Sequence, residues 1–269
     1  MKLNSKTILL WIAAFGFMLV FVVYQRLTGP THPALGHVEL AGETVKYRLL
    51  RSWGKHSDAE IIIKVPNGNI SGTFHFRRFK SFDKWTETQM QKSGEYLIAF
   101  IPHQPPAGKV MYNIRLHSGK ESALLRPEPV ILRYTGVVPP YILWPHIILM
   151  FLAMVFAIRA LIEAFLMRSN IFNLTFLTFI MFLIGGLILG PIVQKYAFDA
   201  YWTGWPLGHD LTDNKVLVSF ILWAVALFKT WKNPKHRAWV IIAGLGLIAV
   251  YLIPHSVLGS EIDFTKMKK

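Results

Sequence analysis

Five of the six carboxylates that lie outside residues 25–138 are gathered at the ends of apolar segments, and two histidines lie among them. The seven residues are Asp199, His209, Asp210, Asp213, His255, Glu261 and Asp263. Neutral imidazole nitrogens and carboxylate oxygens suit Zn, Mn, non-haem Fe or Cu. This combination therefore makes a divalent-metal site a hypothesis, with His146 as one more candidate ligand.

The metal hypothesis depends on convergence of separate segments, because no segment carries a tight spacing such as His-x-x-x-His. A b-type haem would need two facing axial imidazoles, and His146 with His255 is the pair near helix ends. Ser256 and Ser260 lie near His255, but no Gly-x-Ser-x-Gly elbow accompanies them. Whether the chain is an enzyme is left open.

The same carboxylates also allow a structural interpretation as an ion-pair lock between a loop and the C-terminal tail. Its lysines would be Lys195 and Lys215, and their partners Asp210, Asp213 or Glu261. Such a lock specifies geometry more than it adds stability. The alternative to a bound metal is therefore neutralisation by lysine.

Helix-end signals give a second structural explanation. Thr212 or Asp213 is well placed to N-cap the helix whose apolar run starts at Val216. Pro254 would end or kink the last helix and leave His255 to bond the freed carbonyls.

The composition is that of a polytopic membrane protein. Of the 269 residues, 53% are hydrophobic and only 16% are charged. The absence of cysteine excludes disulfides, thiolate metal sites, a cysteine nucleophile and c-type haem attachment.

Five apolar segments predict transmembrane helices; at about 1.5 Å of rise per residue the first is just long enough for a thin hydrocarbon core, and the fourth is somewhat short. They are residues 8–24, 141–158, 171–192, 216–228 and 238–253. The first is favoured as an uncleaved anchor over a signal peptide, because no small-x-small cleavage pattern follows it. The predicted organisation is an anchor (1–24), a β domain (25–138), a four-helix membrane domain (139–256) and a tail (257–269).

Residues 25–138 read as short strands separated by Gly- and Pro-containing turns. Seven segments carry the pattern: HVEL, TVKYRLL, AEIIIKV, ISGTFHFRRF, EYLIAFI, KVMYNIRL and PVILRY. We expect an antiparallel β-sandwich, immunoglobulin-like in outline, inserted between the first and second helices.

Lysine and arginine in the short loops predict the orientation. Eight lie on the side of the KTWKNPKHR loop and five on the other side. This places the N-terminus in the cytoplasm, and the β domain and C-terminus outside, in a bacterial inner membrane. The net charge of +14 is then largely anchoring charge and charge of the outer domain, which argues against a nucleic-acid partner.

Two further patterns concern helix packing. Gly186 and Gly190 stand four apart in the third segment, a spacing that lets helix backbones approach closely. Arg159 and Glu163 are an i, i+4 ion pair.

Two functional hypotheses remain. The first is a membrane-bound binding or assembly protein that presents its β-sandwich to an envelope partner. The alternative is an envelope-facing metalloprotein, metal-dependent membrane enzyme or b-haem protein that uses the His/Asp/Glu cluster.

Overall fold

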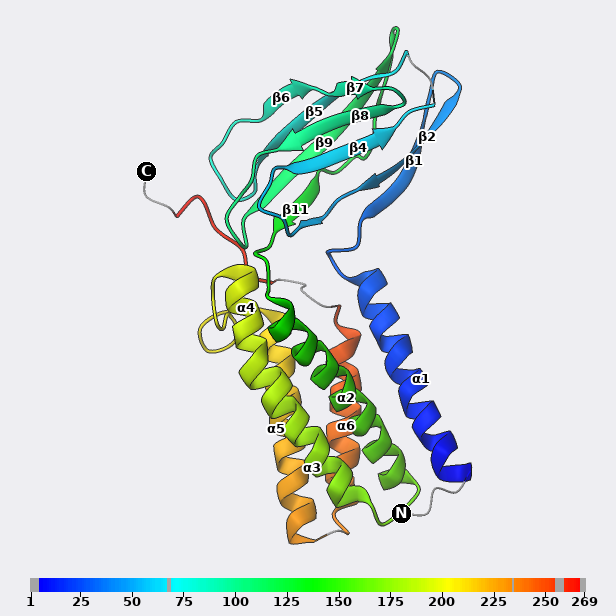
Figure 1. The fold of residues 1–269 in the computed structure, drawn as a ribbon, viewed down its shortest axis with the longest axis vertical. Helices are drawn as coiled ribbons and strands as arrows, with labels where there is room; N and C mark the ends of the chain where they lie inside the picture. The colour runs from blue at the N-terminus through cyan, green and yellow to red at the C-terminus, as the bar shows by residue number, and fades with distance from the viewer. Residues whose placement is uncertain (1–4, 67–68, 234, 255–258, 267–269) are drawn as a thin grey trace. The chain divides into compact units, whose positions relative to one another are not determined.

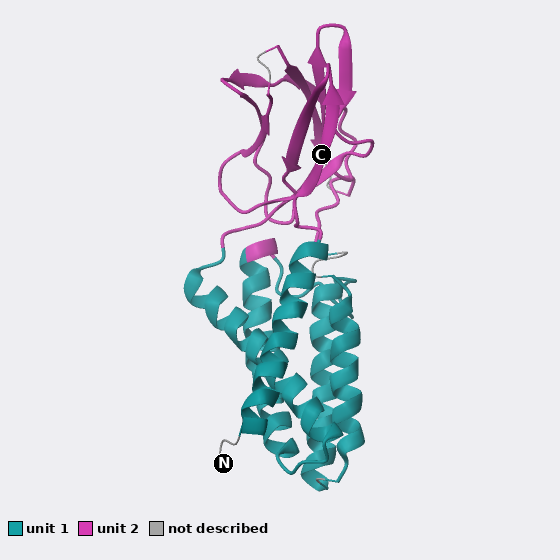
Figure 2. Ribbon diagram, turned by 90° about the vertical axis from the view of Figure 1, so that its right-hand side faces the viewer, with its two compact units in different colours: residues 1–29, 138–196, 200–259 teal, residues 30–137, 197–199, 260–269 magenta. Residues whose placement is uncertain are grey.

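The computed structural model describes residues 5–66, 69–233, 235–254 and 259–266. The chain divides into two compact units, each assembled from separate stretches of sequence (Figure 2). The helical unit comprises residues 1–29, 138–196 and 200–259, and the β unit comprises residues 30–137, 197–199 and 260–269. Residues 260–266 of the tail thus cluster with the strands rather than with the helices that precede them.

The helical unit is built from long apolar helices (Figure 1). Its elements are α1 (Ser5–Thr28), α2 (Pro140–Phe165), α3 (Ile171–Met181), the π-helix η1 (Phe182–Leu189), α4 (Gly190–Phe198), α5 (Leu211–Lys232) and α6 (Arg237–Leu252). Among the described residues, α1, α2, the continuous segment Ile171–Phe198 and α5 are long and apolar enough to cross a membrane, whereas α6 has 16 residues. Four candidate spans are therefore present where five were expected.

Small side chains bring these helices together. Ala153, Ala157, Ala160 and Ala164 recur at three- and four-residue spacing on α2, and all are buried. They share a hydrophobic cluster with Trp223 of α5, whose side chain is fully buried. Because alanine has a small side chain, the stripe lets neighbouring helices pack closely against α2.

Two glycines of α6 make similarly close contacts. A Cβ on Gly244 would lie 2.9 Å from Leu161 of α2, and one on Gly246 would lie 2.4 Å from Leu222 of α5. Both contacts are closer than a methyl group normally allows. The last helix therefore packs closely against α2 and α5 because glycine has no side chain at these two positions.

The predicted pair of Arg159 and Glu163 is present, but it is buried. The Nη2 atom of Arg159 donates to Glu163 at 2.5 Å, and Arg168 lies 3.7 Å from the same carboxylate oxygen. The guanidinium also lies over the ring of Trp11, 5.5 Å from its centroid. Burial makes removal of one partner costly, because it would leave an uncompensated charge in the unit.

The β unit contains eleven strands in the described residues. They are β1 (Ala34–Leu40), β2 (Glu43–Leu49), β3 (Ser52–Trp53), β4 (Ala59–Lys64), β5 (Ser71–Arg78), β6 (Thr86–Gln89), β7 (Gln91–Ser93), β8 (Tyr96–Ile101), β9 (Lys109–Ser118), β10 (Glu121–Leu124) and β11 (Val130–Tyr134). The seven predicted segments are confirmed as strands β1, β2, β4, β5, β8, β9 and β11. The four others have only two to four residues each, and β6 and β7 are exposed and polar, so none carries a hydrophobic alternation long enough to detect.

The strands form three sheets. One sheet runs β3-β11-β9-β5-β6, with β10 also paired to β9, a second runs β4-β8-β7, and β1 pairs with β2 (Figure 1). The pairs are antiparallel except β3–β11, where Ser52 and Trp53 run parallel to Arg133 and Tyr134. A strictly antiparallel domain was expected, so this two-residue pairing is a departure.

Inward-facing side chains of all three sheets form one hydrophobic cluster. Two tyrosines in it keep their hydroxyl groups satisfied: Tyr112 donates to Leu50 O at 2.8 Å and Tyr134 donates to Ile101 O at 2.9 Å. Burial raises the pKa of both phenols, so they stay neutral donors.

Candidate functional site

A buried hydrogen-bond network surrounds the start of α5, and Thr203 is its centre. The hydroxyl of Thr203 donates toward Asp210 at 3.2 Å and toward Asp213 at 3.3 Å, and it accepts from Gln194 at 2.7 Å. Asp210, Asp213 and Gln194 are each less than 9% exposed. The network therefore joins α4, the loop after it and the first turn of α5.

Asp213 is the principal acceptor. Its Oδ2 atom accepts from the backbone N–H of Thr203 at 2.7 Å and from Gln194 at 3.0 Å. A carboxylate that accepts several such bonds fixes the position of its donors, because each bond to an ionised acceptor is strong. Asp213 thus anchors the loop against the helix.

Asp210 is the N-cap of α5. Its side chain accepts from the N–H of Thr212 at 2.8 Å, and the residue itself has extended backbone angles. The expectation that Thr212 or Asp213 would be the cap is wrong, because the helix begins at Leu211, five residues before the apolar run. Hydrophobic periodicity does not detect this polar first turn.

The loop between α4 and α5 is folded on itself by backbone contacts. Asp210 N donates to Thr203 O at 3.0 Å and Gly208 N donates to Gly204 O at 2.8 Å. Asn214 of α5 accepts from the N–H of Trp205 at 2.7 Å. A Cβ on Gly204 would lie 2.6 Å from Asp213, so the loop needs glycine there to approach the helix.

The two lysines of the proposed lock have different surroundings. The Nζ atom of Lys215 donates to the backbone carbonyls of Ile253 at 2.8 Å and Pro254 at 3.3 Å. It therefore caps the end of α6 and also interacts electrostatically with Asp210. The ammonium of Lys195 lies over the ring of Tyr201, 5.6 Å from the centroid.

The two candidate histidines in the described residues have different surroundings. His146 of α2 has its Nδ1 atom 2.8 Å from Gly185 O, within the π-helix η1. His209 is exposed in the loop before α5. His255 lies outside the described residues, so its pairing with His146 or His209 is untested.

The carboxylates of the tail belong to the β unit. Glu261 accepts from Lys109 at 2.5 Å and also from Lys80. Burial raises the pKa of Glu261, but the hydrogen bonds from Lys109 and Lys80 outweigh it and hold that pKa below its ordinary value. Glu261 is thus paired with two lysines that were not expected as its partners.

Backbone contacts continue this docking. Ile262 N donates to Ala107 O at 3.2 Å and Thr265 N donates to Lys80 O at 3.1 Å. Asp263 accepts from Thr265 at 2.5 Å, which is the first cause of the lowered pKa of its carboxyl group. Residues 260–266 therefore form a tail segment held on the strands by charge and by main-chain bonds.

Asp199 is exposed and has a φ of 61°. The residue before it, Phe198, stacks on Arg133, with 3.9 Å between the ring centroid and the guanidinium carbon. Within the described ranges, no group of three or more His, Asp or Glu side chains is placed to hold a metal ion. The candidate ligands that are described have instead the separate surroundings given above.

The glycines of η1 act in packing inside the unit. A Cβ on Gly186 would lie 2.8 Å from Val216 of α5, and one on Gly185 would lie 2.8 Å from Leu149 of α2. Gly190 has only ordinary contacts, 3.7 Å or more. The close approach therefore comes from the adjacent pair Gly185–Gly186 rather than from the four-residue spacing.

Four residues that take part in the α5 network or bind Glu261 were not predicted from the sequence: Gln194, Thr203, Lys80 and Lys109. Gln194 and Thr203 carry no helix-end or motif signal. Lys80 and Lys109 are 181 and 152 residues from Glu261, so no local pattern connects them.

Fold and site together define a class: a chain of long apolar helices with a β unit inserted after the first and a polar network at the start of α5. No protein-family model matches the chain, and no curated protein is significantly similar to it.

Proposed function

We propose that this chain is an integral membrane protein whose β unit binds a protein partner through the outer face of the β4-β8-β7 sheet. The observation that carries the proposal is the apolar character of that face. Ile62, Tyr96 and Phe100 point outward, and each is 44% exposed. On a sheet face that is exposed to solvent, such outward-facing positions are normally occupied by polar residues.

The strand register makes these side chains neighbours. Ile62 is directly opposite Ile98, and Tyr96 and Phe100 lie two residues to either side of Ile98 on β8. Cross-strand neighbours on one face stand about 5 Å apart, so the four side chains form one patch. An exposed patch of this kind is typical of interaction sites.

Charged residues border the patch. Glu60 is opposite Phe100, and Lys64 is opposite Tyr96. Lys64 also forms an exposed ion pair with Glu95 at 3.2 Å. An apolar centre with a charged rim is the usual anatomy of a protein interface, in which the rim governs orientation and association rate.

Membrane placement is part of the same proposal. We infer that α6 crosses as a fifth span, although its 16 residues cover only about 24 Å of a hydrocarbon core of about 30 Å. Local thinning of the bilayer accommodates a short span at modest cost. The N-terminus would be cytoplasmic, and the β unit, an immunoglobulin-like sandwich, would face the envelope of a bacterial inner membrane and meet its partner there.

Site-specific photo-crosslinking in native membranes tests the partner surface. A benzoylphenylalanine at Tyr96 or Phe100 of the full chain should give one discrete adduct with another protein. The same probe at Arg115, an exposed position of β9 in the other sheet, should not. Ile62→Glu should remove the adduct by placing a charge in the apolar patch, whereas Thr88→Glu on exposed β6 should not.

Identical adducts at Arg115 and Phe100 would contradict the proposal. The proposal would also be contradicted if neither Tyr96 nor Phe100 gave a discrete adduct and the gently solubilised protein migrated as a single chain.

A further inference from the structure

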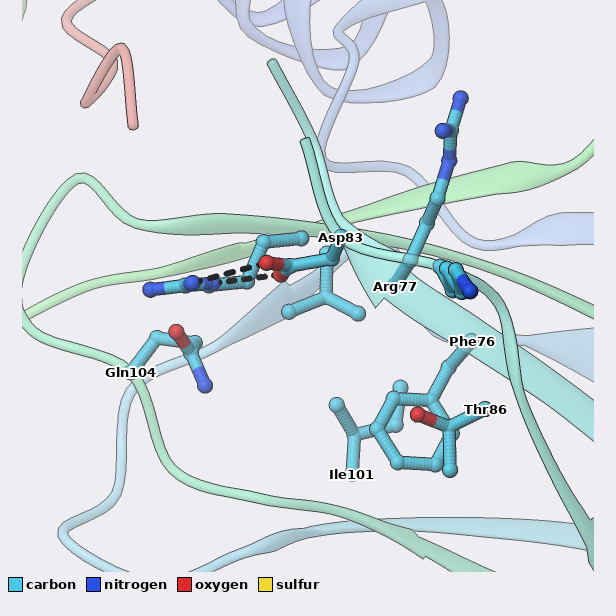
Figure 3. Close-up of a pocket in the computed structure, with 9 residues that line it drawn as sticks. Phe76, Arg77, Asp83, Thr86, Ile101 and Gln104 are labelled. Carbon is cyan, nitrogen blue, oxygen red and sulfur yellow. Dashed lines mark hydrogen bonds and ion pairs between the residues drawn. The ribbon is translucent and has the colours of Figure 1, made fainter. Parts of the chain in front are cut away.

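A second surface of the β unit lies around the loop between β5 and β6. A cavity of about 300 Å³ opens there, with side chains from β5, β6, β8, β9 and two loops (Figure 3). Phe76, Ile101 and Val110 provide apolar walls, and Arg77, Arg78 and Lys84 provide positive charge. The cavity thus combines an apolar interior with a cationic rim.

Two of the three cations are not neutralised. Arg78 is paired with Asp83 through bonds of 2.7 and 2.9 Å, and it is stacked on Phe264 of the tail. Arg77 and Lys84, in contrast, have no carboxylate partner among the described residues. Arg77 extends away from the apolar walls (Figure 3), over the ring of Trp85. The rim therefore carries a net positive charge that an anion would compensate.

The loop beside the cavity carries an unusually exposed aromatic residue. Phe82 is 87% exposed, and it stands between Lys80 and Lys84 in the sequence Phe-Lys-Ser-Phe-Asp-Lys-Trp. Trp85 is 39% exposed. Aromatic side chains interleaved with lysines are typical of segments that lie in a membrane interface, where the rings enter the headgroup region and the ammonium groups meet phosphate.

The pairing pattern places this loop at the end of the β unit where the chain enters and leaves. Ala34 at the start of β1 pairs with Leu49, and Arg133 near the end of β11 pairs with Lys109. Arg78 at the end of β5 pairs with Val110, next to Lys109. The tail enters at the same end, through Thr265 on Lys80.

Chain length then limits the distance to the helices. Only six residue steps separate Thr28 of α1 from Ala34, and six separate Tyr134 from Pro140 of α2. Each connection spans at most about 20 Å when fully extended. With the helices in a membrane, as proposed above, this end of the β unit is tethered close to lipid.

We propose that the cavity and the β5–β6 loop bind an anionic phospholipid of the surrounding membrane. Arg77 and Lys84 meet the lipid phosphate, the apolar walls cover its apolar part, and Phe82 enters the interface beside it. The shared chemistry is a phosphate anion, and the position of Phe82 favours a bilayer lipid over a free phosphate ester. This inference rests on the membrane placement and not on the partner surface.

The chain contains no cysteine, so one cysteine can be placed and labelled at will. Phe82→Cys, labelled with the apolar fluorophore NBD, is reconstituted as the full chain into vesicles of phosphatidylcholine with increasing phosphatidylglycerol. Brominated acyl chains then report contact with the bilayer. The label at position 82 should be quenched as phosphatidylglycerol is added. A label placed by Lys120→Cys, at the far end of β9, should not be.

Charge variants test the anion. Arg77→Gln and Lys84→Gln should each weaken the apparent affinity for phosphatidylglycerol by about fivefold. Lys92→Gln, an exposed lysine on β7, should leave it unchanged. Soluble glycerol 3-phosphate should not compete.

Equal quenching at positions 82 and 120, or no dependence on phosphatidylglycerol, would overturn the inference. Competition by glycerol 3-phosphate would show that the cavity binds a soluble anion rather than a membrane lipid. Failure of the chain to float with vesicles after alkaline extraction would overturn the membrane placement and this inference together. None of these results bears on crosslinking at Phe100.

Discussion

At the scale of single residues, the molecule uses its conspicuous carboxylates as anchors. Asp213 holds Thr203 and Gln194, Asp210 caps α5, and Glu261 holds the tail segment. Each carboxylate lies beside donors that compensate its burial, which is the condition for keeping an ionised group inside a protein. The resulting predictions concern the stability of particular contacts.

Asp213→Asn is expected to lower the free energy of unfolding by about 1.5–3 kcal/mol, because it replaces bonds to an ionised acceptor. Thermal unfolding in detergent measures the change. Asp199→Asn, an exposed carboxylate of the same loop, is the control and should cost less than about 1 kcal/mol. Equal losses for the two variants would show that the network does not depend on the Asp213 charge.

The docking of the tail segment should depend on pH. Because the pKa of Glu261 is held below its ordinary value of about 4.3, the carboxylate stabilises docking above that pH. The contribution is lost as the pH falls from there through the lowered pKa. Hydrogen exchange of the Thr265 and Ile262 amides measures it, and their protection factors, corrected for the pH dependence of intrinsic exchange, should fall in acid.

Glu261→Gln should speed exchange at those amides already at neutral pH and flatten the pH profile. Glu43→Gln, at an exposed strand position, should leave the profile as in the wild type. An unchanged profile in Glu261→Gln would show that the tail segment is held by its main-chain bonds alone.

At the scale of elements, glycine and alanine decide how closely the helices approach. Gly186 meets Val216, Gly244 meets Leu161, and the alanines of the α2 stripe are buried in the core of the unit. In the proposed membrane placement no hydrophobic driving force acts between helices, so such close packing would be a main source of association energy. The effect of adding a methyl group should therefore depend on what the glycine faces.

Gly186→Ala should lower the free energy of unfolding by about 1–3 kcal/mol, because the new methyl group would overlap Val216. A methyl group added by Gly16→Ala in α1 would have nothing within 4 Å. This variant should instead raise the free energy of unfolding by about 0.5–1 kcal/mol, because alanine has a higher helix propensity than glycine. Paired unfolding curves in one detergent compare the two variants. A shift of the same sign in both would contradict the packing explanation.

At the scale of the whole molecule, the β unit is assembled from three separate stretches of sequence, and its last stretch is the tail segment. The chain therefore returns to its β unit after completing the helices. In the proposed topology, the loop before α5 and the tail share the outer side with the strands. The cytoplasmic side would carry the Lys229–Arg237 segment.

Cysteine labelling checks that topology, since the wild-type chain has no cysteine. Single cysteines introduced by Lys120→Cys or Lys266→Cys should react with a membrane-impermeant maleimide in intact spheroplasts. A cysteine introduced by Lys232→Cys should react only after lysis. The reverse pattern would invert the proposed orientation and move the β unit to the cytoplasm.

Local sequence was sufficient to predict the long helices and seven of the strands, because hydrophobic periodicity and turn residues act over a few neighbours. It did not predict β6 and β7, whose side chains are exposed and polar. It also placed the N-cap of α5 too late, since Asp210 precedes a polar first turn. The sequence suggested Lys195 or Lys215 as the partner of Glu261, whereas its partners are Lys80 and Lys109.

The amino-acid sequence by itself therefore determined which segments are apolar helices, which are the seven longer strands and where the ionisable groups stand along the chain. Only the tertiary structure decided which partner each ionisable group has. Glu261 meets lysines more than 150 residues away, and Thr203 meets the carboxylates of Asp210 and Asp213 at the start of α5. The physical reason is that periodicity is a property of neighbouring residues, whereas a buried charge is satisfied by whatever donors the folded chain brings within hydrogen-bonding distance.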